Sequence, residues 1–127
     1  MIDHVKLFVT DPVAGRASYE QALRPLGYRV MIEPGPGVVG MGARRPDFWL
    51  TPADGPPTRC HLAFRADSEY EVEAFHTAAL AAGGTDNGAA GPRPHYHQNY
   101  FSAFVLDPDG NNVEAVYHGA MQPEPSD

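Results

Sequence analysis

The feature that most constrains the fold is a weak internal repeat with a constant offset of 57 residues. Segments 2–9 and 59–66 both look like strands, and each has a histidine at its third position, His4 in the first and His61 in the second. At the same offset Gly27 aligns with Gly84 without a gap. A chain that repeats one supersecondary unit folds into similar units packed side by side. The repeat therefore predicts two related modules.

Helix signals follow each of these strands. In the first half Asp11 and Pro12 predict an N-cap and a first helical residue. In the second half Ser68 and Glu71 form a capping box. Segment 83–99 is rich in glycine and has little periodicity, so we expect a loop there with at most a short strand. Short strand-like pieces separated by turns complete each half: 28–33, 38–42 and 47–51, then 100–106 and 112–117.

The pattern predicts an α+β fold of two βαβββ modules in a single domain over residues 1–119. The modules span about 1–52 and 59–118, and a proline-rich linker, 53–58, joins them. A chain of 127 residues that is 43% hydrophobic suits one core of this kind. Residues 120–127 are expected to form a flexible tail.

Charge and cysteine content exclude several classes of function. The formal net charge is −7 and the basic residues are scattered, whereas nucleic-acid and anionic-membrane binding require a basic face. No apolar stretch is long enough to span a bilayer, and no leader-like segment precedes Ile2. Cys60 is the only cysteine, which excludes an internal disulfide and Cys-rich metal sites. We expect a cytoplasmic protein that binds small molecules.

Strand alternation places three potential metal ligands where they can meet. His4, Lys6 and Phe8 share the face of the first strand opposite its apolar side, and His61 and Arg65 do so in the second half. Glu114 interrupts an otherwise apolar last strand. Two imidazoles and a carboxylate make an open divalent-metal site that leaves positions for substrate. Alternatively, the histidines are ordinary half-buried residues, and Lys6 or Arg65 pairs with Glu114.

These residues lie in motifs that resemble a known superfamily. The segments are Ile-Asp-His4-Val, Cys-His61-Leu-Ala-Phe and, most specifically, Asp-Pro-Asp-Gly-Asn-Asn-Val-Glu at 107–114. With the repeated βαβββ plan, they closely resemble the vicinal oxygen chelate superfamily of glyoxalase I, fosfomycin resistance proteins, extradiol dioxygenases and bleomycin resistance proteins. The resemblance covers about residues 1–119.

The resemblance implies curved mixed sheets that enclose a cavity, with a helix outside each sheet. It implies that His4, His61 and Glu114 hold one divalent metal ion, Fe, Mn, Zn or Ni. It also implies a homodimer whose sites are shared, with His4 of one subunit joining His61 and Glu114 of the other. One departure concerns glyoxalase I, which has a fourth ligand on the strand that corresponds to 47–51. Phe48-Trp49-Leu50 occupies its centre here, so three protein ligands are expected.

Substrate contacts are predicted on the same faces. Glu114 is also a candidate for proton transfer, as the resemblance to glyoxalase suggests. His95, in the loop before Tyr100, is a further candidate for a ligand, a proton-transfer group or a substrate contact, although loop histidines are often simply solvated. The aromatic strand residues have an alternative interpretation too, because such residues often belong to the core. The candidate substrate-binding residues are Phe8, Trp49, His97, Tyr100, Lys6 and Arg65.

The sequence thus predicts a metal-dependent enzyme of glyoxalase or dioxygenase type that acts on a small organic molecule. Lyase or isomerase chemistry, addition to an epoxide and oxygen cleavage all remain open. The alternative is a metal-free protein that sequesters a small compound, as bleomycin resistance proteins do. The acidic balance of the chain would suit a cationic compound, and its aromatic residues could stack on rings.

Overall fold

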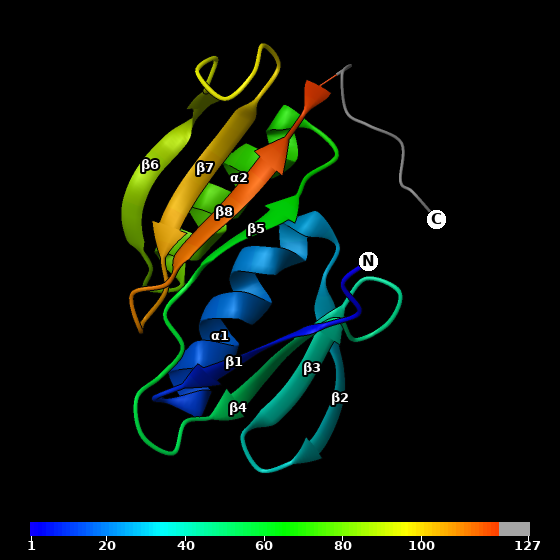
Figure 1. Cartoon of the computed structure of the whole chain (residues 1–127), viewed down its shortest axis with the longest axis vertical. Helices are drawn as coiled ribbons and strands as arrows, with labels where there is room; N and C mark the ends of the chain where they lie inside the picture. The colour runs from blue at the N-terminus through cyan, green and yellow to red at the C-terminus, as the bar shows by residue number, and fades with distance from the viewer. Residues whose placement is uncertain (120–127) are drawn as a thin grey trace.

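The computed structural model describes residues 1–119 and contains two similar halves (Figure 1). The expected tail at 120–127 lies outside these residues. The first half consists of β1 (Val5–Val9), α1 (Pro12–Leu23), a short 3₁₀ turn (Arg24–Leu26), β2 (Arg29–Gly35), β3 (Val38–Gly42) and β4 (Phe48–Pro52). The second consists of β5 (His61–Arg65), α2 (Glu69–Ala81), β6 (Thr85–Pro92), β7 (Phe101–Leu106) and β8 (Asn112–Tyr117).

The two four-stranded sheets have the same topology. Their strand orders are β1-β4-β3-β2 and β5-β8-β7-β6. In each sheet the first strand pairs in parallel with the last strand of its half, and the other pairs are antiparallel. The predicted α+β class and the two βαβββ modules are confirmed.

Both helices begin where the sequence indicates. Asp11 Oδ1 accepts hydrogen bonds from the backbone N–H groups of Val13 and Ala14, at 3.0 and 3.2 Å, before α1. Ser68 Oγ accepts one from Glu71 N at 3.1 Å before α2. Side-chain oxygens at these positions satisfy N–H groups that have no partner within the helix.

Segment 83–99 differs from the prediction, because residues 85–92 form the eight-residue strand β6. β6 is an edge strand whose register against β7 shifts on both sides of Gly88. Such bulges break the period-two pattern by which strands are recognised in a sequence. The prediction of a loop with at most a short strand was therefore wrong.

The two modules share one hydrophobic core. Helices α1 and α2 pack against each other as well as on their sheets. The Phe48 ring lies 5.0 Å from that of Tyr19 on α1 and 5.3 Å from that of Phe64 on β5, measured between centroids. In Figure 1 α1 lies between the two sheets and α2 lies behind β7 and β8, and the two sheets remain separate and do not close on each other. The resemblance had implied an enclosed cavity with a helix outside each sheet.

The Asp-Pro-Asp-Gly segment forms the predicted turn and ties the modules together. Asp107 is buried and accepts hydrogen bonds from the N–H groups of Asp109 and Asn111 and from the Asn111 side-chain amide, at 2.8–2.9 Å. Tyr19 of the first module donates to the same carboxylate at 2.5 Å. Asn111 Oδ1 accepts a bond from Cys60 N at 2.7 Å. These contacts fix the start of β8 beside the start of β5.

None of the helices in residues 1–119 combines the length and the apolar character that crossing a bilayer would require.

Candidate functional site

The face of the second sheet that points away from α2 is exposed along β5 and buried along β7 and β8. Phe64 of β5 and Ala66, which directly follows β5, are buried in the core, whereas His61, Ala63 and Arg65 alternate with them and are exposed. Alternation along a strand accounts for this division.

Glu114 lies at the centre of this surface. In register it lies between Ala63 of β5 and Phe104 of β7. The structure therefore places the carboxylate of the last strand one strand away from the predicted histidine.

His61, Glu114 and Tyr100 form one hydrogen-bonded group. His61 Nε2 lies 2.7 Å from Glu114 Oε1, and the Tyr100 hydroxyl donates to Glu114 Oε2. Glu114 is only 2% exposed, whereas the His61 side chain is 54% exposed. Burial, together with the bond to the carboxylate, raises the pKa of Tyr100 well above its usual value. The buried acid is thus compensated by an imidazole and a phenol. Neither Lys6 nor Arg65 makes an ion pair with it among residues 1–119.

The spacing of His61 and Glu114 suits adjacent ligands of one metal ion. Two donors each bonded at about 2.1 Å and meeting at a right angle would lie about 3.0 Å apart. The observed 2.7 Å is close to this spacing. Imidazole and carboxylate also have the donor chemistry that open divalent sites use, and Tyr100 holds the other carboxylate oxygen.

His4 is not part of this group within the chain. It lies just before β1, on the other sheet, with Nδ1 2.7 Å from Asp3 Oδ1 and about half of its side chain exposed. Across residues 1–119, no three His, Cys, Asp or Glu side chains gather closely enough to hold a metal ion. The chain by itself supplies two of the three expected ligands to one place.

The first sheet brings together Lys6 and Trp49, two of the predicted substrate contacts. They line a cavity of about 410 Å³ that also includes Asp3 and His4. Trp49 lies across Gly40 of β3, where an added Cβ would come within 2.8 Å of the indole ring. Phe8, two residues beyond Lys6 on β1, is 46% exposed. This sheet therefore offers a flat aromatic surface beside a lysine.

The loop before β7 brings histidines to the end of the second sheet. His97 Nε2 lies 2.9 Å from Nδ1 of His118, and the Tyr100 ring meets both imidazoles nearly edge-on, with centroids 5.2 and 5.4 Å away. The His95 ring contacts the Tyr96 ring in the same loop, with centroids 4.2 Å apart and planes tilted by 45°. His118 is not among the residues that the sequence singles out. It is half-buried, and burial, followed by the charges of His97 and Arg65, lowers the pKa of His118.

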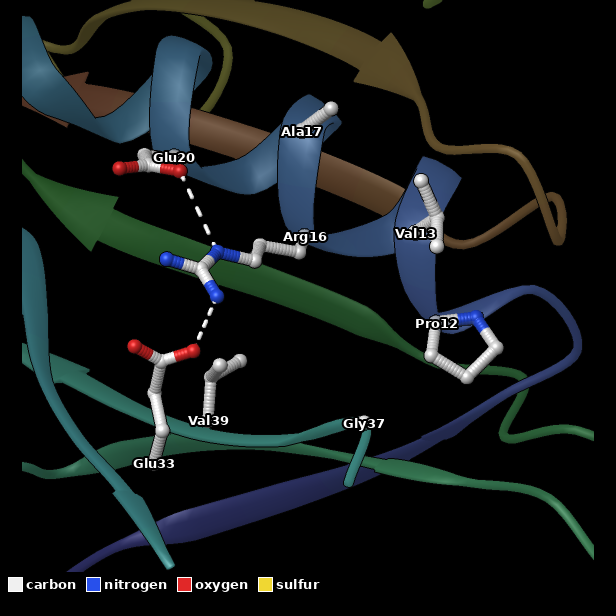
Figure 2. A pocket seen from close by; sticks show the side chains of 8 residues that line it. All are labelled: Pro12, Val13, Arg16, Ala17, Glu20, Glu33, Gly37 and Val39. Atoms are coloured by element: carbon white, nitrogen blue, oxygen red, sulfur yellow. Dashed lines mark hydrogen bonds and ion pairs between the residues drawn. The ribbon is translucent and has the colours of Figure 1, made fainter. Parts of the chain in front are cut away.

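A separate cavity of about 430 Å³ lies between α1 and the β2–β3 hairpin (Figure 2). Arg16 points across it and forms ion pairs with both Glu20 and Glu33. These charged groups satisfy one another. The cavity also lies on the helix side of the first sheet, away from Lys6 and Trp49, so it is not part of the candidate site.

Sequence reasoning also missed Arg93, which follows β6 and lies over the Phe104 ring with its guanidinium carbon 5.5 Å from the centroid. No motif marks this residue. The signal that was available is a pair of glycines, Gly88 and Gly91, within an irregular segment.

Comparison with solved structures agrees with this architecture. A glyoxalase/bleomycin resistance protein from Albidiferax ferrireducens T118 is 26% identical, with a TM-score of 0.79 over 95% of this chain and 98% of that one. A lactoylglutathione lyase from Agrobacterium tumefaciens is 23% identical, with a TM-score of 0.70 over 98% of each chain. A glyoxalase-related enzyme from Fulvimarina pelagi is 20% identical, with a TM-score of 0.74 over 100% of this chain and 94% of that one.

No protein of curated function matches the chain significantly. The family model for the Glyoxalase/Bleomycin resistance protein/Dioxygenase superfamily matches residues 1–115, which include the first module, most of the second and all three predicted metal ligands. With its two βαβββ modules and its His61–Glu114 pair, the chain belongs to the Glyoxalase/Bleomycin resistance protein/Dioxygenase superfamily.

Proposed function

We propose that this protein is a metal-dependent enzyme of glyoxalase or dioxygenase type that acts on a small organic molecule. The observation that carries the proposal is the 2.7 Å pairing of the exposed His61 with the buried carboxylate of Glu114. A bound cation would offset the cost of holding this carboxylate away from water.

Two ligands come from the second sheet and the third comes from the first. His61 Nε2 and Glu114 Oε1 would hold the ion, and His4 of a second copy of the chain would complete the set. His4 lies just before β1 with about half of its side chain exposed, where another subunit can reach it. The proposed active form is therefore a homodimer with shared sites.

The remaining residues of the site have distinct roles in this proposal. A divalent ion bound there would act as a Lewis acid on one or two substrate oxygens. Tyr100 donates to Glu114 Oε2 and so keeps Oε1 directed toward His61. Glu114 can take up a proton from the substrate when its carboxylate is free to accept one. Trp49, Phe8 and Lys6 would contact the substrate from the first sheet.

Metal analysis of variants tests the ligand set. Protein reconstituted with Fe, Mn, Zn and Ni in turn should bind stoichiometric metal, and His4→Ala, His61→Ala and Glu114→Ala should each lose it. His76→Ala is the matched control, because His76 is bonded to Asp86 on the helix side of the second sheet. Retention of metal in all three site variants would refute the proposed ligands.

Mixing two inactive variants tests whether sites are shared. In a mixed dimer of His4→Ala and Glu114→Ala subunits, one site combines an intact His4 with an intact His61 and Glu114. Metal binding should therefore return when the two variants are unfolded together and refolded. If each site lay within one chain, mixing would restore nothing.

A metal-free sequestering protein is the second candidate. The exposed faces of Phe8 and Trp49 favour it, because aromatic surfaces of this kind stack on planar compounds. In that case the wild-type protein would bind none of the four metals after reconstitution, and substitution of Trp49 would abolish ligand binding.

A further inference from the structure

Arg93 is held in a fixed position on the face that carries His61 and Glu114. Its Nη2 donates to Ala89 O at 2.7 Å and its Nη1 to Pro92 O at 3.3 Å. The guanidinium lies over Phe104, whose ring centroid is also 6.1 Å from that of His61. Since Phe104 partners Glu114 in the sheet, Arg93 lies beside the proposed metal ligands.

The irregular shape of β6 creates the space in which Arg93 lies. A Cβ at Gly91 would come within 3.2 Å of Arg93 Nη1, and one at Gly88 within 3.4 Å of Nη2 and 2.9 Å of the Phe104 ring. Gly88 also has a φ of 149°, which L-residues rarely adopt. These two glycines and the register shifts around Gly88 let the side chain fold back along its own strand.

Most of the hydrogen-bonding capacity of Arg93 remains unused. A guanidinium carries five N–H donors, and the two bonds to backbone carbonyls use two of them. Within residues 1–119 Arg93 makes no ion pair with an acid. A fixed guanidinium with free donors is suited to a planar or tetrahedral oxyanion, which it can bind through two parallel hydrogen bonds.

The surroundings of Arg93 also favour an anion. Arg65 is exposed on the same face, in register with Val116 of β8. Glu114, the acid of this face, is already hydrogen-bonded on both oxygens. Ser102, between Val116 and Gly91 in the sheet, has a buried hydroxyl without a hydrogen-bond partner in the part of the chain that the structure describes. An acceptor atom reaching this row of the sheet would satisfy that hydroxyl.

We infer that Arg93 forms an oxyanion subsite beside the His61–Glu114 pair, and that the substrate is a small organic acid bearing a carboxylate or a phosphonate. The identification of this anion as substrate rests on the proposed function, whereas the subsite itself does not. The net charge of −7, which suggested a cationic ligand, reflects the chain as a whole and not this face.

Titration with simple anions tests the subsite. The probes are acetate and methylphosphonate, with acetamide and tetramethylammonium as the neutral and cationic comparisons. The Nε–H signal of Arg93 is followed by ¹⁵N NMR in the full chain at constant ionic strength. We expect this signal to shift with one or both anions and with neither comparison compound. The stronger of the two anions identifies the acid group.

Variants assign the binding to the fixed guanidinium. Arg93→Ala should weaken anion binding about tenfold, as loss of a charge-assisted bidentate contact implies. Arg93→Lys keeps the charge but loses the planar donor pair, so its affinity for the anion should lie between those of the wild type and Arg93→Ala. Arg24→Ala, which removes the same charge from the exposed end of α1, should bind like the wild type.

Three results would overturn the inference: an unresponsive Arg93 signal, equal weakening in Arg24→Ala, or tighter binding of tetramethylammonium than of either anion. Metal content measured on the same samples separates this inference from the proposed enzyme. Arg93-dependent anion binding without metal binding would refute the proposed metal-dependent enzyme and support the anion subsite. Metal binding without Arg93-dependent anion binding would refute the subsite and support the proposed enzyme.

Discussion

The hydrogen bond between Tyr19 and Asp107 links the two modules, and removing it should measurably destabilise the protein. The Tyr19 side chain is 2% exposed and Asp107 is 8% exposed, so the bond is made away from water. A hydrogen bond to a charged group contributes about 1.5–3 kcal/mol. Asp107 keeps three N–H donors when the phenol is removed, so its charge does not become unpaired. We therefore expect Tyr19→Phe to lower the free energy of unfolding by about 1.5–2 kcal/mol.

The chain offers a matched control in Tyr28, which donates to Asp47 at 2.7 Å in a half-buried position. Tyr28→Phe removes the same atom and should cost about 0.5–1 kcal/mol, because water can replace the lost bond. Urea unfolding followed by circular dichroism measures the free energy of unfolding of both variants. With an m-value of about 1.5 kcal/mol/M, Tyr19→Phe should lower the urea midpoint by about 1 M. A cost for Tyr19→Phe no larger than that for Tyr28→Phe would refute the reasoning.

Three further predictions concern single residues. Gly40→Ala should displace the Trp49 indole and destabilise the chain by about 1–3 kcal/mol. Because Trp49 is the single tryptophan, its fluorescence emission should shift to the red. Unchanged fluorescence would contradict the close contact between Gly40 and Trp49. The pKa of His118, measured by NMR titration, should lie below 6.5 and should rise in Arg65→Ala. Because the pKa is lower in the folded than in the unfolded protein, protonation of His118 favours unfolding. The free energy of unfolding should therefore be unaffected by this histidine above pH 6.5 and should fall as the pH drops below that value. Ser68→Ala should cost about 1 kcal/mol in thermal unfolding through loss of the α2 cap, and a Thr variant should retain most of that stability.

Local chemistry made much of the fold predictable. Asp11 and Ser68 accept the hydrogen bonds that their positions before α1 and α2 indicate, because capping depends on residues only two or three apart. Strand alternation likewise separated His61 from the buried Phe64, because the two faces of a half-buried sheet differ in polarity. The same argument placed Glu114 opposite the core-facing side of its strand.

What could not be predicted depends on contacts between distant segments. β6 lacks alternation because it bulges at an exposed edge, and the position of Arg93 follows from that bulge. The partners of Asp107 and Glu114 come from α1 and from the loop before β7, and no spacing in the sequence specifies them. In the proposed dimer, the position of His4 relative to the other two ligands would depend on how the subunits pair, and alternation within one strand does not determine that.

The strand order of the second sheet has a consequence for how this chain acquires its site. β5 is an edge strand with β8 as its neighbour, so it has no pairing partner in its sheet until the polypeptide has been made as far as Tyr117. Glu114 arrives with that same strand. A product broken off after Leu106 would leave both edges of β5 unpaired and available for intermolecular association, and would lack the acid that faces His61. Pairing of β5 and creation of the candidate centre thus both depend on the same strand, β8.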